Sequence, residues 1–209
     1  MDIDMETLGA DAAYRWMTMT VVPRPIAWVT SIDGEGRVNA APFSFFTCLS
    51  ANPPLVGITI MSRQGRSKDT LANACEMGDY VINIASEENL IALNKTSIEA
   101  PRDFTEPQYA GLHLIPSRKV RPPAIQDAPV HLECRYETDL AFGYDDGQNH
   151  PTHLLVGRIV AMDVDDGIMH DGYIDPVRLK ALGRLGGPLF CQSTQLMRLN
   201  RPRWPEDAL

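Results

Sequence analysis

The sequence has only four cysteines, at positions 48, 75, 134 and 191, and none of them belongs to a CxxC pair. Disulfide frameworks and structural zinc sites both depend on characteristic cysteine spacings, so this distribution argues against both. An isolated cysteine in a reducing compartment usually behaves as a small apolar side chain. We therefore expect all four cysteines to be reduced and buried, and we expect no metal site.

Surplus positive charge and long apolar runs are also missing. The chain has 27 acidic and 19 basic residues, which gives a formal net charge of -8 at pH 7. Nucleic acids and anionic membrane surfaces attract proteins with an excess of Lys and Arg, so neither is an expected partner. The first residues, MDIDMETLGA, carry acids where a secretion signal has a basic region, and the run PLVGITIM is too short to span a bilayer. These absences predict a cytoplasmic protein.

Three glycine motifs are absent as well. The chain contains no GxGxxG, no GxxxxGKS or GxxxxGKT, and no GxSxG pattern. These motifs build the phosphate turn of dinucleotide-binding folds, the P-loop and the nucleophile turn of many hydrolases. Any flavin or nicotinamide cofactor must therefore be bound in another way.

The apolar pattern that is present predicts a mainly β protein with a few helices. Turn residues at 33–36 separate the first two strands, which predicts a hairpin. Because the strands outnumber the helices and their connections are short, an antiparallel barrel that leaves few strand edges exposed fits best. At 209 residues the chain is expected to form one domain, 1–209, with its core at about 22–187. The strands are expected at 25–32, 38–46, 54–61, 80–85, 130–142 and 152–164, with a short one at 112–116, and the helices at 67–78, 87–97 and 175–182.

In the segment 130–142, VHLECRYETDLAF, the even-numbered residues from Val130 to Leu140 form one face, and the charged or histidine residues from His131 to Asp139 form the other. Strict alternation is typical of an antiparallel strand with one face on the core and the other in solvent. We expect 152–164 to be its partner strand.

The loop RQGRSKDT, residues 63–70, gathers basic and hydroxyl side chains at the predicted start of a helix. The amides and the positive dipole end of a helix N-terminus attract phosphate groups, and Arg66, Lys68 and Thr70 add suitable donors. The alternative is an ordinary surface helix that is capped by Ser67 or Asp69.

The stretch NAAPFSFF, residues 39–46, places a proline and a serine among three phenylalanines. Pro42 has no amide hydrogen for a strand ladder and restricts Ala41 to an extended conformation. Backbone groups without strand partners can bind the polar edge of a ligand, while Ser44 offers a hydroxyl and the phenylalanines a wall for a planar ring. The alternative is that these rings fill the barrel or a subunit interface.

Hydroxyls and histidines give weaker signals. Thr30 and Ser31 end a predicted strand, where they suit either a phosphate or ribityl chain or the turn itself. His150 and His153 flank Pro151, which prevents the helix that would bring them together on one metal ion. We expect His153 to be a surface or pocket residue.

Several of these motifs occur in the order of one known family. PRPIAWVTSIDGEGRVNAAPFSFF, PPLVGITI, RSKDTLAN, YVINIA, HLLVGRIV and RLGG follow one another between Val22 and Gly187. This arrangement resembles the flavin reductase-like family of FMN-binding split barrels, which includes flavoredoxin.

The resemblance implies a homodimeric, antiparallel split β-barrel with a few helices and with FMN near the dimer interface. It also implies hydride transfer from NADH or NADPH to the N5 atom of FMN, or of FAD as a substrate, in a site that needs no protein acid or nucleophile. A flavin-dependent monooxygenase or an electron-transfer protein is an implied partner. By the family's pattern, the phosphate and ribityl chain would lie against Thr30, Ser31, Ser62, Arg66, Lys68, Asp69 and Thr70, and the isoalloxazine against Ala41, Pro42, Phe43, Ser44, Phe45 and Phe46.

One position departs from the family's pattern. Many of these reductases have a histidine five residues before the glycine of the late strand, where this chain has Thr152, and His153 is displaced by one. A displacement of one residue turns a side chain to the other face of a strand unless a bulge compensates. The sequence therefore leaves three functions open: an NAD(P)H-dependent flavin reductase, an FMN-holding electron carrier that a protein donor reduces, and a non-catalytic interaction module.

Overall fold

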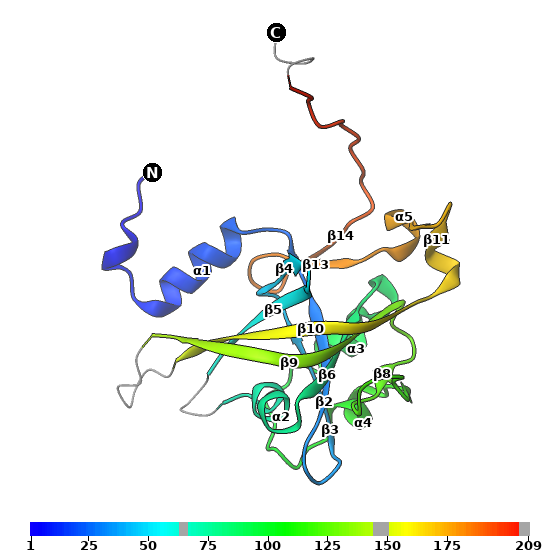
Figure 1. The fold of residues 1–209 in the computed structure, drawn as a ribbon. Coiled ribbons are helices and arrows are strands. Elements are labelled where there is room, and N and C mark those ends of the chain that lie inside the picture. The colour runs from blue at the N-terminus through cyan, green and yellow to red at the C-terminus, as the bar shows by residue number, and fades with distance from the viewer. Residues whose placement is uncertain (63–66, 144–150, 205–209) are drawn as a thin grey trace.

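Seven antiparallel strands form the main sheet of the protein (Figure 1). The structure is a computed structural model and describes residues 1–62, 67–143 and 151–204. The strand order in this sheet is β3-β2-β6-β9-β10-β5-β4, and each neighbouring pair is antiparallel. The strands are β2 (Ala27–Ile32), β3 (Val38–Phe43), β4 (Phe46–Ala51), β5 (Pro54–Met61), β6 (Asp79–Ile84), β9 (Val130–Phe142) and β10 (Thr152–Val164).

The two edge strands of this sheet, β3 and β4, are consecutive in the chain. Only Ser44 and Phe45 separate them, and the amide of Thr59 on β5 donates a hydrogen bond to the carbonyl oxygen of Phe45 at 2.7 Å. The chain thus leaves one edge of the sheet and enters the other within two residues, so the sheet curls back on itself. The predicted antiparallel, mainly β architecture is confirmed.

Short helices and strands surround this sheet. The described helical elements are η1 (Met5–Thr7), α1 (Ala10–Thr20), α2 (Asp69–Met77), η2 (Glu87–Asn89), α3 (Leu90–Lys95), α4 (Glu106–Ala110), η3 (Asp166–Ile168) and α5 (Pro176–Leu179). The short strands are β1 (Arg24–Pro25), β7 (Leu114–Ile115), β8 (Ala124–Ile125), β11 (Met169–His170), β12 (Tyr173–Ile174), β13 (Leu182–Arg184) and β14 (Phe190–Gln192).

Two apolar clusters lie on opposite faces of β2. The larger fills the inside of the curled sheet and includes Val29, Ile58 and Leu155, each fully buried. The smaller lies outside it around Trp28, whose Nε1 donates to the Thr96 hydroxyl at 2.8 Å. Both faces of the sheet's centre are therefore covered, and only its margins are left for a binding site.

Strand β9 corrects one prediction, because its first half is buried on both faces. His131 and Glu133 are buried, although the alternation predicted that they face solvent. The Glu133 carboxylate accepts hydrogen bonds from the amides of Arg118 and Lys119 at 2.8 and 2.6 Å, and a ring nitrogen of His131 lies 2.8 Å from the Ile125 carbonyl oxygen. The loop of residues 116–128 thus covers this face and satisfies its polar groups.

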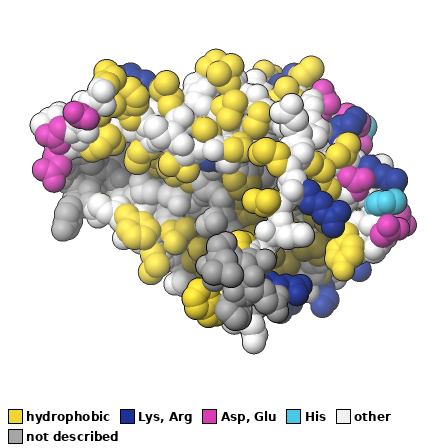
Figure 2. Space-filling model, turned by 90° about the horizontal axis from the view of Figure 1, so that it is seen from above, with side chains coloured by type: hydrophobic (Ala, Val, Ile, Leu, Met, Phe, Trp, Pro, Cys, Tyr) yellow, Lys and Arg dark blue, Asp and Glu magenta, His cyan; other side chains and the backbone are white. Residues whose placement is uncertain are grey.

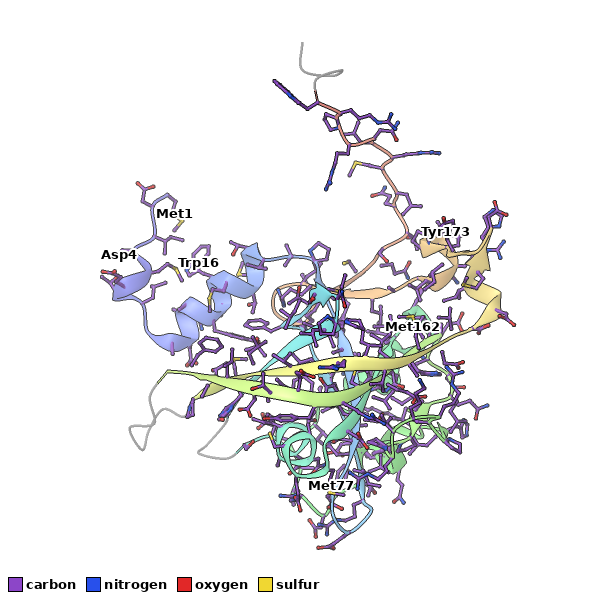
Figure 3. All side chains as sticks on the ribbon, viewed as in Figure 1. Met1, Asp4, Trp16, Met77, Met162 and Tyr173 are labelled. Atoms are coloured by element: carbon purple, nitrogen blue, oxygen red, sulfur yellow. The ribbon has the colours of Figure 1, made fainter. Side chains whose placement is uncertain are left out.

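Helix α1 was not predicted from the sequence. It runs from Ala10 to Thr20 and carries Trp16 on a segment that extends away from the sheet (Figure 3). Helix α2, whose last residue Met77 is labelled in the same figure, ends as predicted at Gly78, which has a φ of 79°. Helix α3 is shorter than expected and follows the short η2 turn, where Ser86 and Asn89 form a capping box.

All four cysteines are free thiols, but only Cys134 is buried. Cys48 and Cys75 are exposed, so the prediction of four buried cysteines is wrong for them. Among the residues that the structure describes, no helix is both long and apolar enough to cross a membrane.

Candidate functional site

A groove runs along the outer edge of β3, from the start of α2 to β13. It consists of three adjoining hollows of about 730, 220 and 250 Å³. The first two share Ala41 and Lys68, and the last two share Tyr14 and Ser44. The start of α2 and the proline-containing segment, which are separated in the sequence, therefore line one continuous surface.

The first hollow lies at the N-terminus of α2. Lys68 is the N-cap residue, and its side chain forms no capping hydrogen bond to the amides of the first turn. The prediction that Ser67 or Asp69 caps this helix is wrong, since Ser67 instead donates to the Lys68 carbonyl oxygen at 3.4 Å. Lys68 Nζ lies 4.0 Å from a carboxylate oxygen of Glu99 across the groove. The helix start thus presents backbone amides and an ammonium group beside the hollow.

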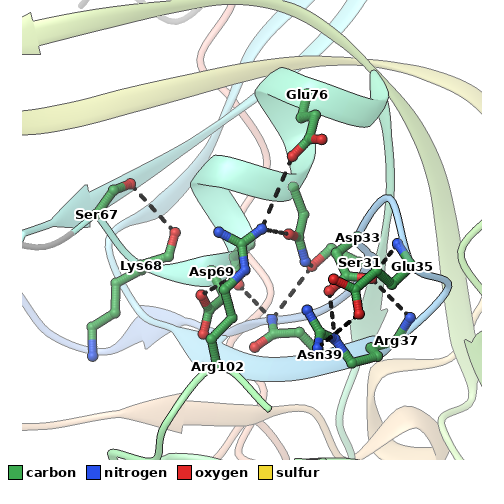
Figure 4. A network of polar contacts seen from close by, with 12 residues as sticks. Ser31, Asp33, Glu35, Arg37, Asn39, Ser67, Lys68, Asp69, Glu76 and Arg102 are labelled. Atoms are coloured by element: carbon green, nitrogen blue, oxygen red, sulfur yellow. Dashed lines mark hydrogen bonds and ion pairs between the residues drawn. The ribbon is translucent and has the colours of Figure 1, made fainter.

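A buried polar network holds α2 against the sheet behind this hollow (Figure 4). Asn39 on β3 donates to the Thr70 hydroxyl at 2.9 Å, and Asn73 donates to the Ser31 hydroxyl at 3.1 Å. Ser31 is completely buried, so it fixes the position of α2 and does not line the groove. Asp69 and Thr70 do line it.

Two further residues of the expected phosphate set lie away from the groove, and a third is not described. Thr30 is fully buried and donates to the Pro123 carbonyl oxygen at 2.6 Å, because its side chain points to the outer face of β2. Ser62 donates to the carbonyl oxygen of Pro151 at 3.0 Å. Arg66 lies outside the described residues.

The middle hollow is built by the link between β3 and β4. Pro42 belongs to β3, which is an edge strand, so its missing amide hydrogen disturbs the sheet less than we expected. The chain breaks from strand geometry two residues later, at Ser44 and Phe45. Residues Ala41, Pro42, Phe43, Ser44 and Phe45 all line this hollow.

Phe46 has a different place from the other two phenylalanines. It opens β4 opposite Ile58 and packs against the core inside the curled sheet. Phe43 contacts that core and also lines the groove. The two proposed roles of the aromatic segment, ligand wall and core filling, are therefore divided among its residues.

Arg24 contacts the link between β3 and β4, and this role was not predicted from the sequence. Its guanidinium is buried and donates to the carbonyl oxygens of Thr18, Val21 and Leu185 at 2.6, 2.8 and 3.0 Å, and to the Ser44 hydroxyl oxygen at 3.3 Å. Burial lowers the pKa of Arg24. Because the Ser44 oxygen accepts from Arg24, the hydrogen of this hydroxyl is available to another acceptor.

Phe45 lies between Arg24 and α1. Its ring centroid is 5.9 Å from Cζ of Arg24 and 6.2 Å from the ring centroid of Tyr14, with which it is stacked. Tyr14 in turn lines both the middle and the end hollow. Helix α1 thus forms one wall of the groove, which the sequence did not predict. The spacing of Tyr14, Met17 and Val21 on one helical face was the signal that could have found it.

His153 lies on the other face of the sheet. It pairs with Ile60, which is buried in the core, whereas the neighbouring Thr59 and Met61 line the middle hollow. The strand pairing of β10 with β5 runs without interruption from Thr152 to Arg158, so no bulge in this pair restores the side chain to the groove side. This position does not support the contact with a nicotinamide that was considered for His153.

The His153 ring instead belongs to a polar cluster around Asp139. Its Nδ1 lies 2.6 Å from the Asp139 carboxylate, which also accepts from the Tyr136 hydroxyl at 2.8 Å. The hydrogen bonds from His153 and Tyr136 lower the pKa of Asp139, and Asp139 raises the pKa of Tyr136 to about 12. Cys75 Sγ lies 3.8 Å from the same carboxylate. No group of side chains in the described residues has the composition of a metal site, and His150 is not among those residues.

Glu106 is a further groove residue that the sequence did not reveal. It opens α4, is buried, and lines the first hollow. Its Oε2 has no hydrogen-bond partner among the residues that the structure describes. Burial raises the pKa of this carboxyl group, and Asp69 adds to the effect.

Comparison with sequence families gives one match over most of the chain. The flavin reductase like domain matches residues 19–177. An uncharacterized protein of Halalkalibacterium halodurans is 37% identical over 203 residues, which is 97% of each chain.

Solved structures agree with this match. Nitrilotriacetate monooxygenase component B from Bacillus cereus is 31% identical, with a TM-score of 0.90 over 95% of this chain and 98% of that one. The 2-nitrobenzoate 2-nitroreductase of Pseudomonas fluorescens is also 31% identical, with a TM-score of 0.87 over 98% of both chains. A split barrel domain from Shewanella frigidimarina, 21% identical with a TM-score of 0.82 over 97% of this chain and 100% of that one, shows the fold alone. The predicted split barrel is thereby confirmed.

Proposed function

The chain belongs to the flavin reductase-like domain family, and from this premise we propose that it is an FMN-binding oxidoreductase that reduces flavin with NADH or NADPH. The observation that carries the proposal is the continuity of the groove, because Lys68 and the segment 41–45 line the same hollow. A phosphate site and a surface for a planar ring then lie within reach of one nucleotide.

We assign the phosphate of FMN to the first hollow. The residues present fit such a group, since the N-cap residue Lys68 does not cap the first-turn amides of α2 with its own side chain and lines the same hollow. The Thr70 hydroxyl already accepts from Asn39, which leaves its hydrogen for a phosphate oxygen. Arg66 remains a predicted phosphate contact in a segment that the structure does not describe.

We assign the isoalloxazine ring to the middle hollow. Pro42 and Phe43 offer apolar surface there, and the hydrogen of the Ser44 hydroxyl is available to an acceptor on the ring's polar edge. When bound, FMN supplies the centre that accepts a hydride and passes electrons on. The protein's part is to hold the ring in place, to exclude water from one of its faces and to leave the other open to a donor.

Nicotinamide use is the less supported half of the proposal. His153 is turned away from the groove, and Thr152, which pairs with Met61, lies on the groove side instead. This arrangement favours a second candidate, an electron carrier that keeps FMN and receives electrons from a protein donor. The non-catalytic alternative loses support because the basic helix start and the aromatic segment share one groove.

We further propose a homodimer. Helix α1 and its C-cap residue Val21 expose several large apolar side chains beside the groove, and hydrophobic side chains gather over the face seen from above (Figure 2). The exposed fractions of Tyr14, Met17, Met19 and Val21 are 43, 44, 59 and 63%, and such exposure of apolar surface is costly for a free monomer.

A partner enzyme is also proposed. Because one structural relative is component B of a monooxygenase, a flavin-dependent monooxygenase is the proposed recipient of reduced flavin.

A kinetic assay tests the main proposal. Purified protein is mixed with FMN or FAD, and the oxidation of NADH or NADPH is followed by absorbance. We expect faster oxidation than free flavin gives, and heat-denatured protein serves as the control. If the protein is yellow and is reduced by a protein donor but by neither NADH nor NADPH, the electron carrier is the correct function and not the reductase. A protein that does not bind flavin at all would contradict both proposals.

A further inference from the structure

The end hollow of the groove, next to β13, has a composition that the proposed function does not use. It has a volume of about 250 Å³ and is lined by aromatic rings together with a few polar groups. Arg184 on β13 is its cationic side chain, and Asn94 and Ser97 also line it. Its size is below that of drug-sized ligand pockets, which begin at about 300 Å³, so a ligand with a single ring is the appropriate scale.

Two guanidinium groups place positive charge at or beside this hollow. Arg184 and the buried Arg24 are close enough for their charges to interact, which contributes to the lowered pKa of Arg24. In the part of the chain that the structure describes, neither guanidinium forms an ion pair with a carboxylate. Two neighbouring guanidinium groups with no carboxylate partner among the described residues favour a ligand that brings a negative charge, although the chain as a whole has a net charge of -8.

The orientation of Arg184 is fixed from two sides. Its Cζ lies 4.3 Å from the centroid of the Phe190 ring, and its Nη2 donates to the Gly187 carbonyl oxygen at 2.7 Å. These contacts leave its remaining N–H groups without a partner among the described residues. A guanidinium held in this way is prepared for a carboxylate, whose two oxygens match its planar fork.

We propose that the end hollow binds a small aromatic carboxylate, with its carboxylate group on Arg184 and its ring against Tyr14, Phe43 and Phe190. Arg24 acts on this ligand only through its charge, because its hydrogen bonds hold backbone carbonyls and Ser44. The binding chemistry is independent of flavin. The placement of this ligand beside a flavin ring rests on the proposed function, because the end hollow shares Pro42, Phe43 and Ser44 with the middle one.

Direct binding of benzoate tests the proposal. Calorimetric titrations with benzoate and with its neutral analogue benzamide are performed on the full chain, before and after the addition of FMN. We expect benzoate to bind more tightly than benzamide, and Arg184→Ala to weaken benzoate by about 10- to 100-fold, as expected for a lost charge-assisted contact, while benzamide changes little. Arg184→Lys should retain part of the preference, and Arg198→Ala, on the exposed tail, is the matched control that should change neither ligand.

Four results would overturn the proposal. The first two are equal affinity for benzoate and benzamide, and no benzoate binding at millimolar concentration. The third is benzoate binding that Arg184→Ala leaves unchanged. The fourth is an Arg184-dependent affinity for nicotinamide mononucleotide that is stronger than the affinity for benzoate, because it would assign the hollow to a nucleotide phosphate. Circular dichroism identifies a variant that does not fold, in which case Arg184→Lys decides. If FMN does not bind but Arg184-dependent benzoate binding persists, the proposed function fails and this inference stands.

Discussion

Lys68 lines both the first and the middle hollow of the groove. Its side chain is 37% exposed, so replacing it should not disturb the core. We predict that Lys68→Ala costs about 1.5 to 3 kcal/mol of FMN binding free energy, because one charge-assisted phosphate contact is lost. Riboflavin, which has no phosphate, should bind equally to both proteins in a fluorescence titration, and Lys95→Ala should behave like the unchanged protein. An equal loss for riboflavin would place the phosphate elsewhere.

Glu106 gives a prediction on the pH dependence of stability. Its pKa is raised above the ordinary value of 4.5 by burial, so the folded state binds its proton more tightly than the unfolded state does. The free energy of unfolding therefore decreases as pH rises from 4.5 through the raised pKa, where the buried group must ionise. Glu106→Gln should raise the melting temperature at pH 8 and change it little at pH 4. The exposed Glu88→Gln is the control, and a gain that is the same at both pH values would contradict this assignment.

The residues that line the groove were predictable only where a short motif carries them. Lys68, Thr70 and Ser44 stand in such motifs, and the structure places all three along the groove. Thr30 and Ser31 were placed wrongly because their burial depends on the Pro123 loop and on Asn73, which are distant in the sequence. The positions of Arg24 and Glu106 depend on contacts that form only in the folded chain, so no local sequence pattern predicts those positions.

At the scale of elements, the pairing of β9 with β10 depends on Gly157. A bulge interrupts the pairing of these strands between Val156 and Gly157, and there the Tyr80 side chain approaches the backbone. A Cβ atom at position 157 would overlap the Tyr80 hydroxyl and approach Cζ to 2.6 Å. We predict that Gly157→Ala lowers the free energy of unfolding by about 1 to 3 kcal/mol, as overpacking does. Urea denaturation measures this, and Gly9→Ala, which has open space around it, should cost far less.

Strands were easier to predict than helices in this chain. The bounds of β5, β9 and β10 follow from the apolar alternation and the flanking turn residues, and they agree with the structure. Burial within β9 did not follow from the alternation, because the polar side chains of His131 and Glu133 are satisfied by a loop that covers them. Helix α1 was missed because its N-cap residue, Gly9, has no capping side chain, so the apolar spacing of residues such as Tyr14 and Met17 was the main signal for it in the sequence.

At the scale of the whole molecule, the exposed apolar surface predicts association. We expect a dimer with twice the mass of the 23.2 kDa chain in light scattering. A charge at an exposed apolar position of α1, as in Met19→Glu, should raise the dimer dissociation constant, because it would be buried without a partner. Asp11→Lys, on the first turn of the same helix, is a control for charge alone. A wild-type protein that remains a monomer at high concentration would contradict this prediction.

The order of the motifs along the chain proved more informative than each motif alone. The basic helix start and the proline-containing segment each had an ordinary structural explanation, but the curled sheet brings them to one groove. The end hollow could not be predicted, because it needs α1, α3 and β13 together. The single-domain organisation of residues 1–209 stays a prediction.

A crystal structure of the protein with FMN tests the central claim most directly. The account predicts one FMN per groove, with its phosphate within hydrogen-bonding distance of Lys68 and the α2 amides and its ring against Pro42, Phe43 and Ser44. An FMN that is bound outside this groove, or whose phosphate lies away from the start of α2, would contradict it.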